Sequence, residues 1–551
     1  MLKPIGYIVG ESEPTRFTFA VLPDSVPPIL EYVCVYVPEN IDGARLEVPV
    51  LAQVQRIIQR NPLLNEYTSS NAISKLSMTN VGIHQILAEA RVLGYSYKGK
   101  VRYPRYAPLP GSPVYRAPDD LLRALYQVEP DSAIHIGHLI NRPDVDVYLD
   151  VRGFSRHVAI LAATGAGKSH TAGVIIEGLL KKGATIVAID PHGDYSRMHE
   201  AADGRAFHEL SDRITIFSVG PYSIGKTRYY IKVSDLSEDE LAYMARIPSS
   251  AVNIRFILSL ALKRLHEKHV DDKSFDLDEL ISLLNKWGRG DIEEPYKSRL
   301  KGIKDWNKSI FNTIKYLEQL KKLRVFSRSS VPLNHLLKPM HLSVINLTGV
   351  PFEAQDIVVY DVLRRIFISR VNAVTNSSGE KFPYPVFIIL EEAHRFVPPR
   401  RDSSTYSSTI IRTIASEGRK FGVYLIVISQ RPSKIDSDVL SQCQSQIVLR
   451  IVNPIDQRTI SESSEAFSEP LLENLPGLNV GEAVIVGPIV RTPVMVKVKE
   501  KRITKHGGMD LPIVSLLKKA REEATMEAQG ITEVERARYY ITRIRREISG
   551  E

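Results

Sequence analysis

Residues 157–180 read HVAILAATGAGKSHTAGVIIEGLL, and this stretch decides the fold of the chain. It begins as an apolar run, passes through a glycine-rich turn and continues as a helical pattern. Its middle, residues 162–169, matches the spacing of a phosphate-binding loop in its strand–loop–helix context. Further apolar runs at 185–190, 214–219, 342–347, 386–391 and 423–429 alternate with helical segments. The sequence therefore predicts an α/β, RecA-like P-loop motor domain on a parallel sheet.

The residue types of this loop fit a bound nucleoside triphosphate, so we expect ATP and Mg²⁺ as cofactors. The glycines let consecutive N–H groups point at phosphate oxygens, and the following helix adds its positive end. Lys168 should reach the β- and γ-phosphates, and Ser169 should ligate Mg²⁺. Ala162 replaces the first glycine of the motif, at a strand end that can tolerate a methyl group. The expected nucleotide contacts are Thr164, Gly165, Ala166, Gly167, Lys168, Ser169 and His170.

Two adjacent acids end the apolar run VFIIL at residues 386–390. Glu391 is expected to hold the magnesium shell, and Glu392 to polarise the attacking water. The alternative is a pair of exposed acids at a strand end. The phosphate loop upstream favours the catalytic interpretation.

Three further residues have two interpretations each. Gln430 ends the run VYLIVIS, where it could sense the γ-phosphate or position water. Arg419 precedes that run and is either a cation favoured at a helix end or a group that reaches the nucleotide of a neighbouring subunit. Asp190 follows another strand and either supports the metal or caps an Asp-Pro turn. His157, at a strand start, is expected to be structural.

The rest of the chain divides into three further segments. Residues 1–150 are β-rich and predict a small barrel or sandwich, which one helical stretch, VLAQVQRIIQR (50–60), interrupts. Within the motor domain, 151–500, residues 235–330 predict a helical insertion that opens with a capping box at Ser237 and Glu240. Residues 501–551 predict a helical tail with 11 basic and 8 acidic residues, which lies on the body, reaches a neighbouring subunit or is loose.

Charge and composition narrow the function class. The net charge is +9, and residues 281–330 alone hold 12 basic against 5 acidic residues. This window indicates either a nucleic-acid partner or a solvated basic face. Two distant cysteines exclude a disulfide framework and a multi-cysteine zinc site. No apolar run suggests a membrane span or a signal peptide, so we expect a cytoplasmic protein.

Four motifs together resemble the HerA family of archaeal hexameric DNA translocases, within the FtsK–HerA superfamily. They are TGAGKSHT (164–171), DPHGDY (190–195), FIILEEAHRFVP (387–398) and EGRKFGVYLIVISQRPSKID (417–436). The resemblance implies a homo-hexameric ring with ATP between subunits and double-stranded DNA in its channel. It also implies a NurA nuclease partner, other repair proteins and a role in DNA end resection. Lys168, Ser169, Glu391, Glu392 and Gln430 match family positions, Arg419 matches a trans-acting arginine, and Arg156 matches a second one.

Other functions are an ATP-gated scaffold for a nuclease and a conjugation- or packaging-type pump. For DNA contact we favour Arg400 and Arg401, in the segment 398–405, over the basic cluster of the insertion. That cluster comprises Lys297, Arg299, Lys301, Lys304 and Lys308. We expect residues 1–150 to dock the nuclease, the alternative being that they only brace neighbouring subunits.

Overall fold

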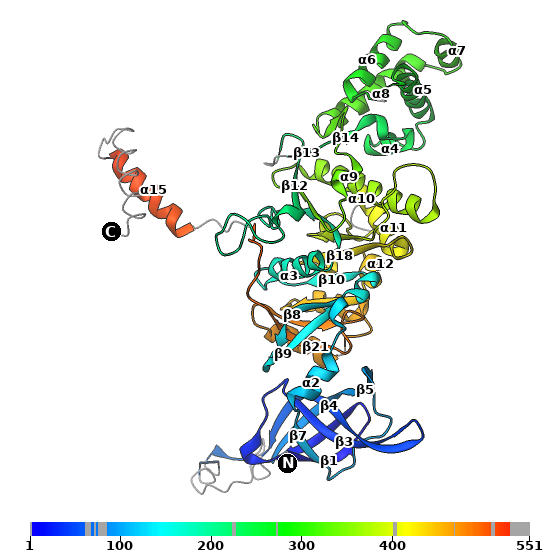
Figure 1. The fold of residues 1–551 in the computed structure, drawn as a ribbon. Helices are drawn as coiled ribbons and strands as arrows, with labels where there is room; N and C mark the ends of the chain where they lie inside the picture. Colours follow the sequence, from blue (N-terminus) through cyan, green and yellow to red (C-terminus); the bar gives the residue numbers. More distant parts are fainter. Residues whose placement is uncertain are drawn as a thin grey trace. The chain divides into compact units, whose positions relative to one another are not determined.

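The computed structural model describes residues 3–60, 68–70, 73–74, 85–222, 227–271, 274–400, 405–467, 469–507 and 513–528. The chain separates into two compact units, Met1–His506 and Gly507–Glu551. The first contains both large sheets and most helices (Figure 1). The second contains α15 (Ile513–Ala528), which confirms a helix in the predicted tail. Residues 501–507, which the prediction counted with that tail, form no helix, and Thr504 instead pairs with Ala201 in a β-bridge. Within the described residues, every helix is too short or too polar to cross a membrane.

A closed antiparallel barrel forms the N-terminal part of the first unit. Its strands follow the order β2-β1-β7-β3-β4-β5, and pairing of β2 with β5 closes the ring. The short strand β6 extends from β5 beyond the ring. Alternating apolar residues fill the interior, among them Phe19, Val35 and Val50. The strands are β1 (Pro4–Ser12), β2 (Arg16–Val21), β3 (Tyr32–Ile41), β4 (Ala44–Arg60), β5 (Gln85–Tyr97), β6 (Lys100–Arg102) and β7 (Pro113–Arg116).

The helix predicted at residues 50–60 was wrong, because this stretch is the second half of strand β4. It pairs with β5, and the register shifts between Leu51 and Ala52 and again between Val54 and Arg56. Each such bulge places an extra residue in one strand and interrupts the two-residue alternation that identifies a strand. The apolar spacing therefore resembled a helix, while the partner strands on both sides decide the structure.

The barrel is joined to the motor sheet through α2 (Asp119–Tyr126) and the buried acid Glu31. Glu31 accepts hydrogen bonds from Arg116 and from Arg142, with Arg142 Nε at 2.8 Å. Arg142 begins β9 (Arg142–Asp150), which pairs with β8 (Ala133–Leu139). Both strands lie in the motor sheet. The predicted boundary at residue 150 counted residues 133–150 with the N-terminal domain. Their strand pairing places them in the motor sheet instead.

Within the described residues, the motor sheet has 12 strands in the order β13-β12-β16-β11-β17-β18-β10-β19-β20-β21-β8-β9. Neighbouring strands are parallel from β13 to β19 and antiparallel from β19 onward. The predicted parallel strands are confirmed, and β13 and β19 are two further parallel strands that the sequence did not predict. The parallel strands are β10 (Val158–Leu161), β11 (Thr185–Asp190), β12 (Ile214–Val219), β13 (Thr227–Tyr229), β16 (Leu342–Asn346), β17 (Val386–Leu390), β18 (Val423–Ser429) and β19 (Ser445–Leu449). The chain then adds β20 (Glu482–Val486) and β21 (Val494–Val498).

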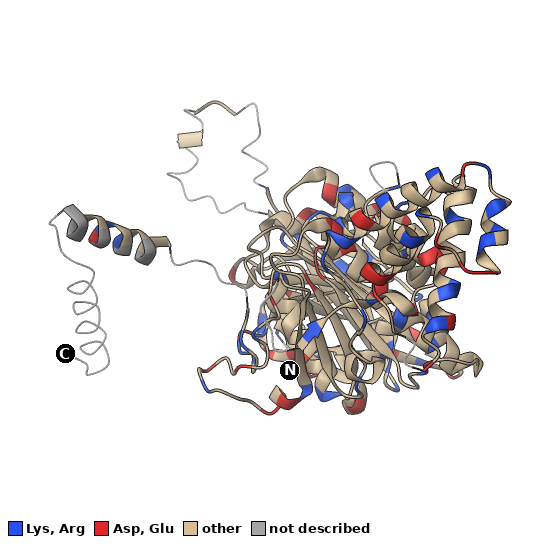
Figure 2. Cartoon of the chain, turned by 90° about the horizontal axis from the view of Figure 1, so that it is seen from above, with Lys and Arg blue, Asp and Glu red and all other residues tan. Residues whose placement is uncertain are grey.

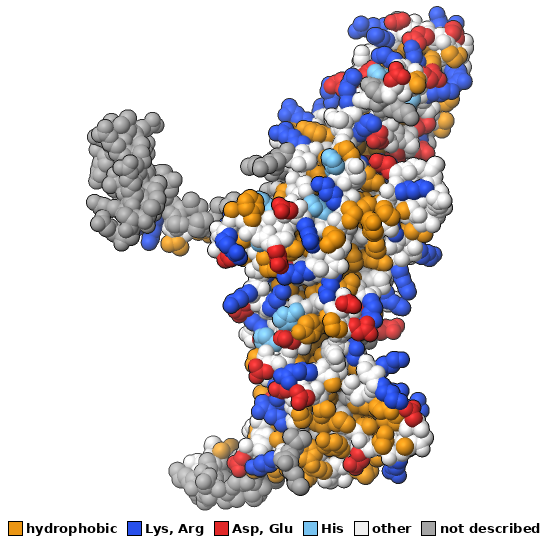
Figure 3. Space-filling model, viewed as in Figure 1, with side chains coloured by type: hydrophobic (Ala, Val, Ile, Leu, Met, Phe, Trp, Pro, Cys, Tyr) orange, Lys and Arg blue, Asp and Glu red, His pale blue; other side chains and the backbone are white. Residues whose placement is uncertain are grey.

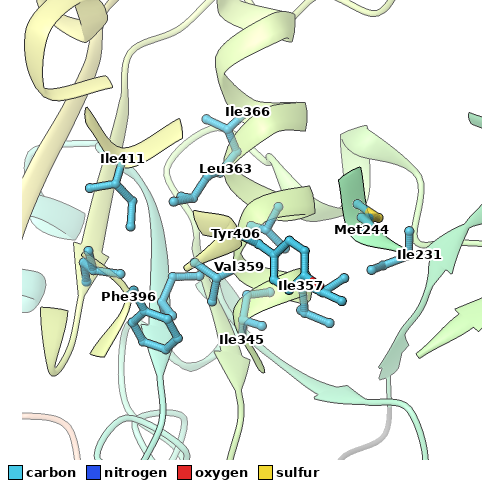
Figure 4. Close-up of a cluster of buried hydrophobic side chains, with 14 of the residues drawn as sticks. Ile231, Met244, Ile345, Ile357, Val359, Leu363, Ile366, Phe396, Tyr406 and Ile411 are labelled. Atoms are coloured by element: carbon cyan, nitrogen blue, oxygen red, sulfur yellow. The ribbon is translucent and has the colours of Figure 1, made fainter. Parts of the chain in front are cut away.

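Helices cover both faces of this sheet. On one face α3 (Lys168–Lys181) packs on Ile160, Ala188 and Ile447. On the other face lie α10 (Phe352–Thr375) and α11 (Tyr406–Phe421). Figure 4 shows their contact, where Val359, Leu363 and Ile411 meet Phe396 and Tyr406. The remaining helices of the motor are α9 (Leu333–Leu336), α12 (Ser437–Gln442), α13 (Pro454–Ser463) and α14 (Glu469–Asn474).

The predicted helical insertion leaves and rejoins the motor through one short parallel pair, β14 (Ile231–Lys232) with β15 (Phe326–Ser327). Its first helix begins with the predicted capping box, since Ser237 and Glu240 each accept the other's backbone N–H. Lys and Arg residues recur along the helices of the insertion (Figure 2). The helices are α4 (Glu238–Met244), α5 (Val252–Lys268), α6 (Leu277–Gly288), α7 (Tyr296–Lys301) and α8 (Trp306–Lys321).

Candidate active site

The phosphate loop connects the carboxyl end of β10 to the start of α3. Gly165 and Gly167 have φ of 75° and 102°, a region that favours glycine, so both are needed for the turn. Ala162 N–H donates to Ser429 and Ala163 N–H to Arg450, which fixes the loop between β18 and β19. No acceptor in the described parts of the chain takes the N–H groups of Gly165 or Gly167. These free donors suit phosphate oxygens.

Lys168 lies at the centre of the site, between the two acids. Its Nζ is 2.8 Å from Glu391 Oε1 and 2.5 Å from Glu392 Oε1. Burial alone would lower the pKa of Lys168, but the two neighbouring carboxylates outweigh burial and raise it. Lys168 is therefore charged, and the loop and both acids share one location, as the motifs predicted.

The pKa values of the two acids shift in opposite directions. Glu391 is fully buried, and this burial raises its pKa despite the charge of Lys168. Burial also acts on Glu392, but hydrogen bonding from His394 and the charge of Lys168 outweigh it and lower the Glu392 pKa to about 2. Glu392 adopts a left-handed backbone, with φ of 49°. A permanently ionised Glu392 can orient and polarise a water, while Glu391 is held deeper in the site.

Asp190 builds the turn that supports Glu391. Its carboxylate accepts the N–H groups of Gly193, Asp194 and Tyr195 at 2.8–3.0 Å. Tyr195 in turn donates its hydroxyl to Glu391 Oε2 at 2.7 Å. Of the two interpretations of Asp190, this geometry corresponds to the turn cap. Asp190 acts on the site through the residues that its turn carries.

Two hydroxyls of the loop bond to groups on neighbouring strand ends. Ser169 Oγ donates to Asp194 Oδ2 at 2.6 Å, and Thr164 Oγ1 donates to Gln430 Oε1 at 2.6 Å. Asp194 follows β11 and Gln430 follows β18, on either side of the acid pair on β17. Hydroxyl and carboxylate oxygens are the ligands that Mg²⁺ prefers, so Ser169, Asp194 and Glu391 fit a magnesium site together with the phosphates.

The two candidate trans-acting arginines lie at the opposite edge of the sheet. Arg156 precedes β10, and Arg419 lies in the last turn of α11, just before β18. Since β10 and β18 are parallel neighbours, their amino ends meet at one edge, away from the phosphate loop. Both side chains are exposed. Arg156 Nη1 donates to Gln444 Oε1 at 2.8 Å, and within the described ranges Arg419 has no ion pair.

His157 locks this amino edge together, as its expected structural role requires. Its Nδ1 accepts the Leu425 N–H at 2.9 Å, and its Nε2–H donates to the Ala415 carbonyl of α11 at 3.1 Å. Burial lowers the pKa of His157 to about 4, so the ring is neutral. The residue therefore fixes the segment of Arg156 against the helix of Arg419.

His170 and the end of the motor form a further contact with α3. His170 Nε2 donates to the Lys499 carbonyl at 2.8 Å. Two turns along the same helix face, buried Glu177 accepts Thr504 Oγ1 at 2.7 Å, and Arg502 lies over Gly173, where a Cβ would meet its guanidinium. Sequence reasoning missed this contact, as well as the roles of Asp194, Tyr195 and His394. For Asp194 and Tyr195, their place directly after a strand next to the loop was an available signal.

The two candidate DNA-binding segments differ in their charge pairing. Arg400 bonds Asp438 Oδ2 at 3.0 Å and lies near Asp436, while Arg401 lies outside the described residues. The five cations of the insertion cluster are exposed, and none forms an ion pair with another described residue. The charges of the insertion cluster are therefore free to pair with phosphates. Arg400, in contrast, follows the catalytic strand β17 closely in the chain.

Known proteins are similar to this chain over most of its length. Residues 134–366 match the model of the helicase HerA central domain. A DNA double-strand break repair helicase HerA from Pyrococcus furiosus is 33% identical over 93% of this chain and 96% of its own. The chain belongs to the HerA helicase family. It is accordingly an ATP-hydrolysing helicase or translocase. The phosphate loop and the paired acids predicted the hydrolysis, and the resemblance to the HerA family implied the helicase or translocase activity. A probable helicase of Methanocaldococcus jannaschii is 32% identical over 94% of each chain.

Two solved structures align with part of this chain. VirB4 of Thermoanaerobacter pseudethanolicus aligns with a TM-score of 0.47 at 15% identity, over 68% of this chain and 98% of its own. The plasmid coupling protein TrwB in complex with ADP and Mg²⁺ aligns with a TM-score of 0.47 at 16% identity, over 70% and 95%.

Proposed function

We propose that this HerA-family protein is an ATP-driven motor that moves along double-stranded DNA as a homo-hexamer. Together with a NurA-type nuclease it would act in DNA end resection during double-strand break repair. The observation that supports this proposal best is the split of charged groups between two edges of one sheet. Lys168, Glu391 and Glu392 meet at the carboxyl edge, whereas Arg156 and Arg419 are exposed at the amino edge. A ring that presents one edge to the other would complete each site.

In this mechanism, each group of the chain has one task. The loop N–H groups and Lys168 bind the phosphates, for which Lys168 must release at least one of its two acids. Glu392, ionised and freed from Lys168, orients the attacking water. Thr164 and Gln430 are linked, so Gln430 can detect the γ-phosphate end of the loop. Mg²⁺, when bound, would neutralise charge on the phosphate oxygens. Arg419 of the adjacent copy would stabilise the charge of the transition state.

Double-stranded DNA should stimulate ATP hydrolysis if the motor function is correct. The test is steady-state hydrolysis with and without a linear duplex, and displacement of a triplex-forming strand as a measure of translocation. A protein that hydrolyses ATP but never displaces the third strand would instead support the ATP-gated scaffold. In that case, nuclease activity in the complex would depend on nucleotide binding and survive Glu392→Gln.

DNA contact is tested by comparing the two basic segments. We expect Arg400→Ala with Arg401→Ala to keep basal hydrolysis, lose DNA stimulation and reduce the salt dependence of binding by up to two phosphate contacts. The matched variant is Lys297→Ala with Arg299→Ala, which removes the same charge from the insertion. If only this second variant loses stimulation and salt dependence, the insertion is the DNA-binding segment.

We propose that the barrel docks the nuclease, because it carries several large apolar side chains that are exposed. The barrel patch comprises Tyr7, Tyr36, Leu46, Tyr106 and Leu109. Figure 3 shows hydrophobic side chains gathered on the visible face of the barrel. Buried Glu39 fixes the segment of Tyr106, since its carboxylate accepts the N–H groups of Arg105 and Tyr106. Exposed aromatic clusters of this kind are typical of protein interfaces.

The docking proposal predicts a selective loss of nuclease binding. Tyr36→Asp with Tyr106→Asp should weaken binding of the NurA-type nuclease from the same organism, while the hexamer and DNA-stimulated hydrolysis persist. Exposed Phe311→Asp, on the insertion, is the control for an apolar-to-acidic change elsewhere. Full nuclease affinity in the barrel variant would rule out this patch, and loss of the hexamer would favour the bracing role.

A further inference from the structure

The orientation of a bound nucleotide follows from where the catalytic groups lie. This step rests on the proposed ATP binding. The acids on β17 and Gln430 on β18 all lie on one side of β10, and they mark the γ-phosphate end. Because the phosphate loop follows β10, which lies between β18 and β19, the nucleoside must leave on the other side. That side consists of the ends of β19, β20 and β21 and the first turn of α3.

At that place the turn before β20 packs directly on the phosphate loop. The Gly481 N–H donates to Ala166 O at 3.0 Å. A Cβ on Gly167 would lie only 3.3 Å from the nitrogen of Gly481 and 3.5 Å from a methyl group of Leu449. The turn is itself held in place, since Lys497 Nζ donates to the Val480 carbonyl at 2.7 Å and Glu482 accepts the Asn479 N–H. The surface beside the phosphates is thus rigid.

Two valines expose their side chains on this surface. Val480 immediately precedes Gly481 and is 55% exposed, and Val452, just beyond the end of β19, is 60% exposed. Since β19 and β20 are antiparallel, the end of one and the start of the other meet at the same sheet edge. Val452 is fixed between Ile451, whose carbonyl accepts Gln457 Nε2, and Asn453, which caps α13. Because the backbone on both sides of these valines is held by hydrogen bonds, their side chains form a fixed apolar surface. A flat heterocyclic ring can pack on such a surface.

We propose that Val480 and Val452 form a nucleoside shelf that binds the purine of the nucleotide whose phosphates the loop holds. The shelf supplies what the phosphate loop lacks, because backbone N–H groups and Lys168 recognise phosphates of any nucleotide. Its continuity with the loop through Gly481 and Ala166 favours a nucleotide over any other occupant. The other occupant is a second copy of this chain, which the experiment distinguishes.

The test compares a ligand that has a nucleoside with one that lacks it. Calorimetry with Mg²⁺ would measure ADP and inorganic tripolyphosphate binding to the full chain and to Val480→Asp, Val452→Asp and Val480→Leu. The control is Val270→Asp, which changes a valine on the insertion that is 66% exposed, slightly more than either shelf valine. We expect ADP affinity to fall about tenfold in each shelf aspartate variant, because a purine then meets a charge instead of an apolar surface. Tripolyphosphate affinity should be unchanged, and Val480→Leu should bind ADP normally.

Three results would overturn the shelf. They are unchanged ADP affinity, an equal loss of ADP and tripolyphosphate affinity, or a change confined to subunit association in light scattering. The second would make the valines supports of the loop, and the third would make them a contact between copies. Lys168→Ala separates these outcomes from failure of the proposed function. It should weaken both ligands, and if the unchanged protein bound neither, ATP binding itself would be refuted.

Discussion

The two edges of the parallel sheet differ in how completely their charged groups are engaged. At the carboxyl edge, Lys168 contacts both acids, and the hydroxyls of Ser169 and Thr164 are bonded to Asp194 and Gln430. At the amino edge, Arg419 has no ion pair in the described part of the chain, and Arg156 bonds only a neutral amide. An arginine that a helix end holds in place without a counter-ion can bind an anion that belongs to another molecule. This difference is the one that our proposal requires, in which one chain holds halves of two different nucleotide sites.

The largest effect should come from the carboxyl edge. Lys168→Ala removes the charge that contacts the phosphates and leaves two buried carboxylates facing each other without a cation. We expect ATP hydrolysis to be lost, by a factor of about 10³ or more. Nucleotide affinity and steady-state hydrolysis measure this, with Lys182→Ala, at the other end of α3, as the control. Substantial hydrolysis in the Lys168 variant would contradict the assignment of the loop.

Glu392→Gln should separate binding from turnover. The amide keeps the size of the side chain but cannot act as the ionised group that orients water, so hydrolysis should fall by about 10² to 10³. ATP affinity should be kept or increased, since Lys168 loses one competing acid. Equilibrium binding and single-turnover hydrolysis are the measurements. Near-normal turnover would contradict this role of Glu392 and would make Glu391 the candidate for orienting the water.

A smaller effect is expected from pH at the amino edge. Folded His157 stays neutral down to its pKa of about 4, whereas the unfolded chain takes up the proton near the ordinary histidine value of 6.5. Its contribution to stability is therefore present above pH 6.5 and is lost as the pH falls toward 4. His157→Gln should make the loss of unfolding free energy between pH 7 and 4.5 smaller by about 1–3 kcal/mol.

Urea unfolding at the two pH values measures this, and nucleotide affinity at pH 7 should be unaffected. His341, whose pKa burial also lowers to about 4, provides the comparison, because it titrates in the same range away from the arginines. An unchanged pH dependence in the His157 variant would mean that the ring does not lock the amino edge.

Motifs with fixed spacing predicted the carboxyl edge because each group there is set by a strand end. Lys168, Glu391 and Gln430 each follow an apolar run, and parallel strands bring such positions to one edge. The sequence could not show which hydrogen bonds form, so Asp194 and Tyr195 were part of a motif but had no predicted role. The helix predicted at residues 50–60 was wrong, because the bulges of β4 disrupt the alternation of apolar and polar residues that identifies a strand. The strands β8 and β9 were counted with the barrel, because the local sequence does not show which strands pair.

In the proposed hexamer, each nucleotide site combines the carboxyl edge of one chain with the amino edge of the next. The most direct measurement mixes Arg419→Ala chains with Glu392→Gln chains and follows ATP hydrolysis after subunit exchange. Each parent should be inactive, and an equal mixture should recover roughly a quarter of wild-type hydrolysis, because random assembly gives that share of interfaces both intact groups. A mixture that exchanges subunits, as native mass spectrometry would show, yet hydrolyses no more ATP than its parents would contradict the shared site.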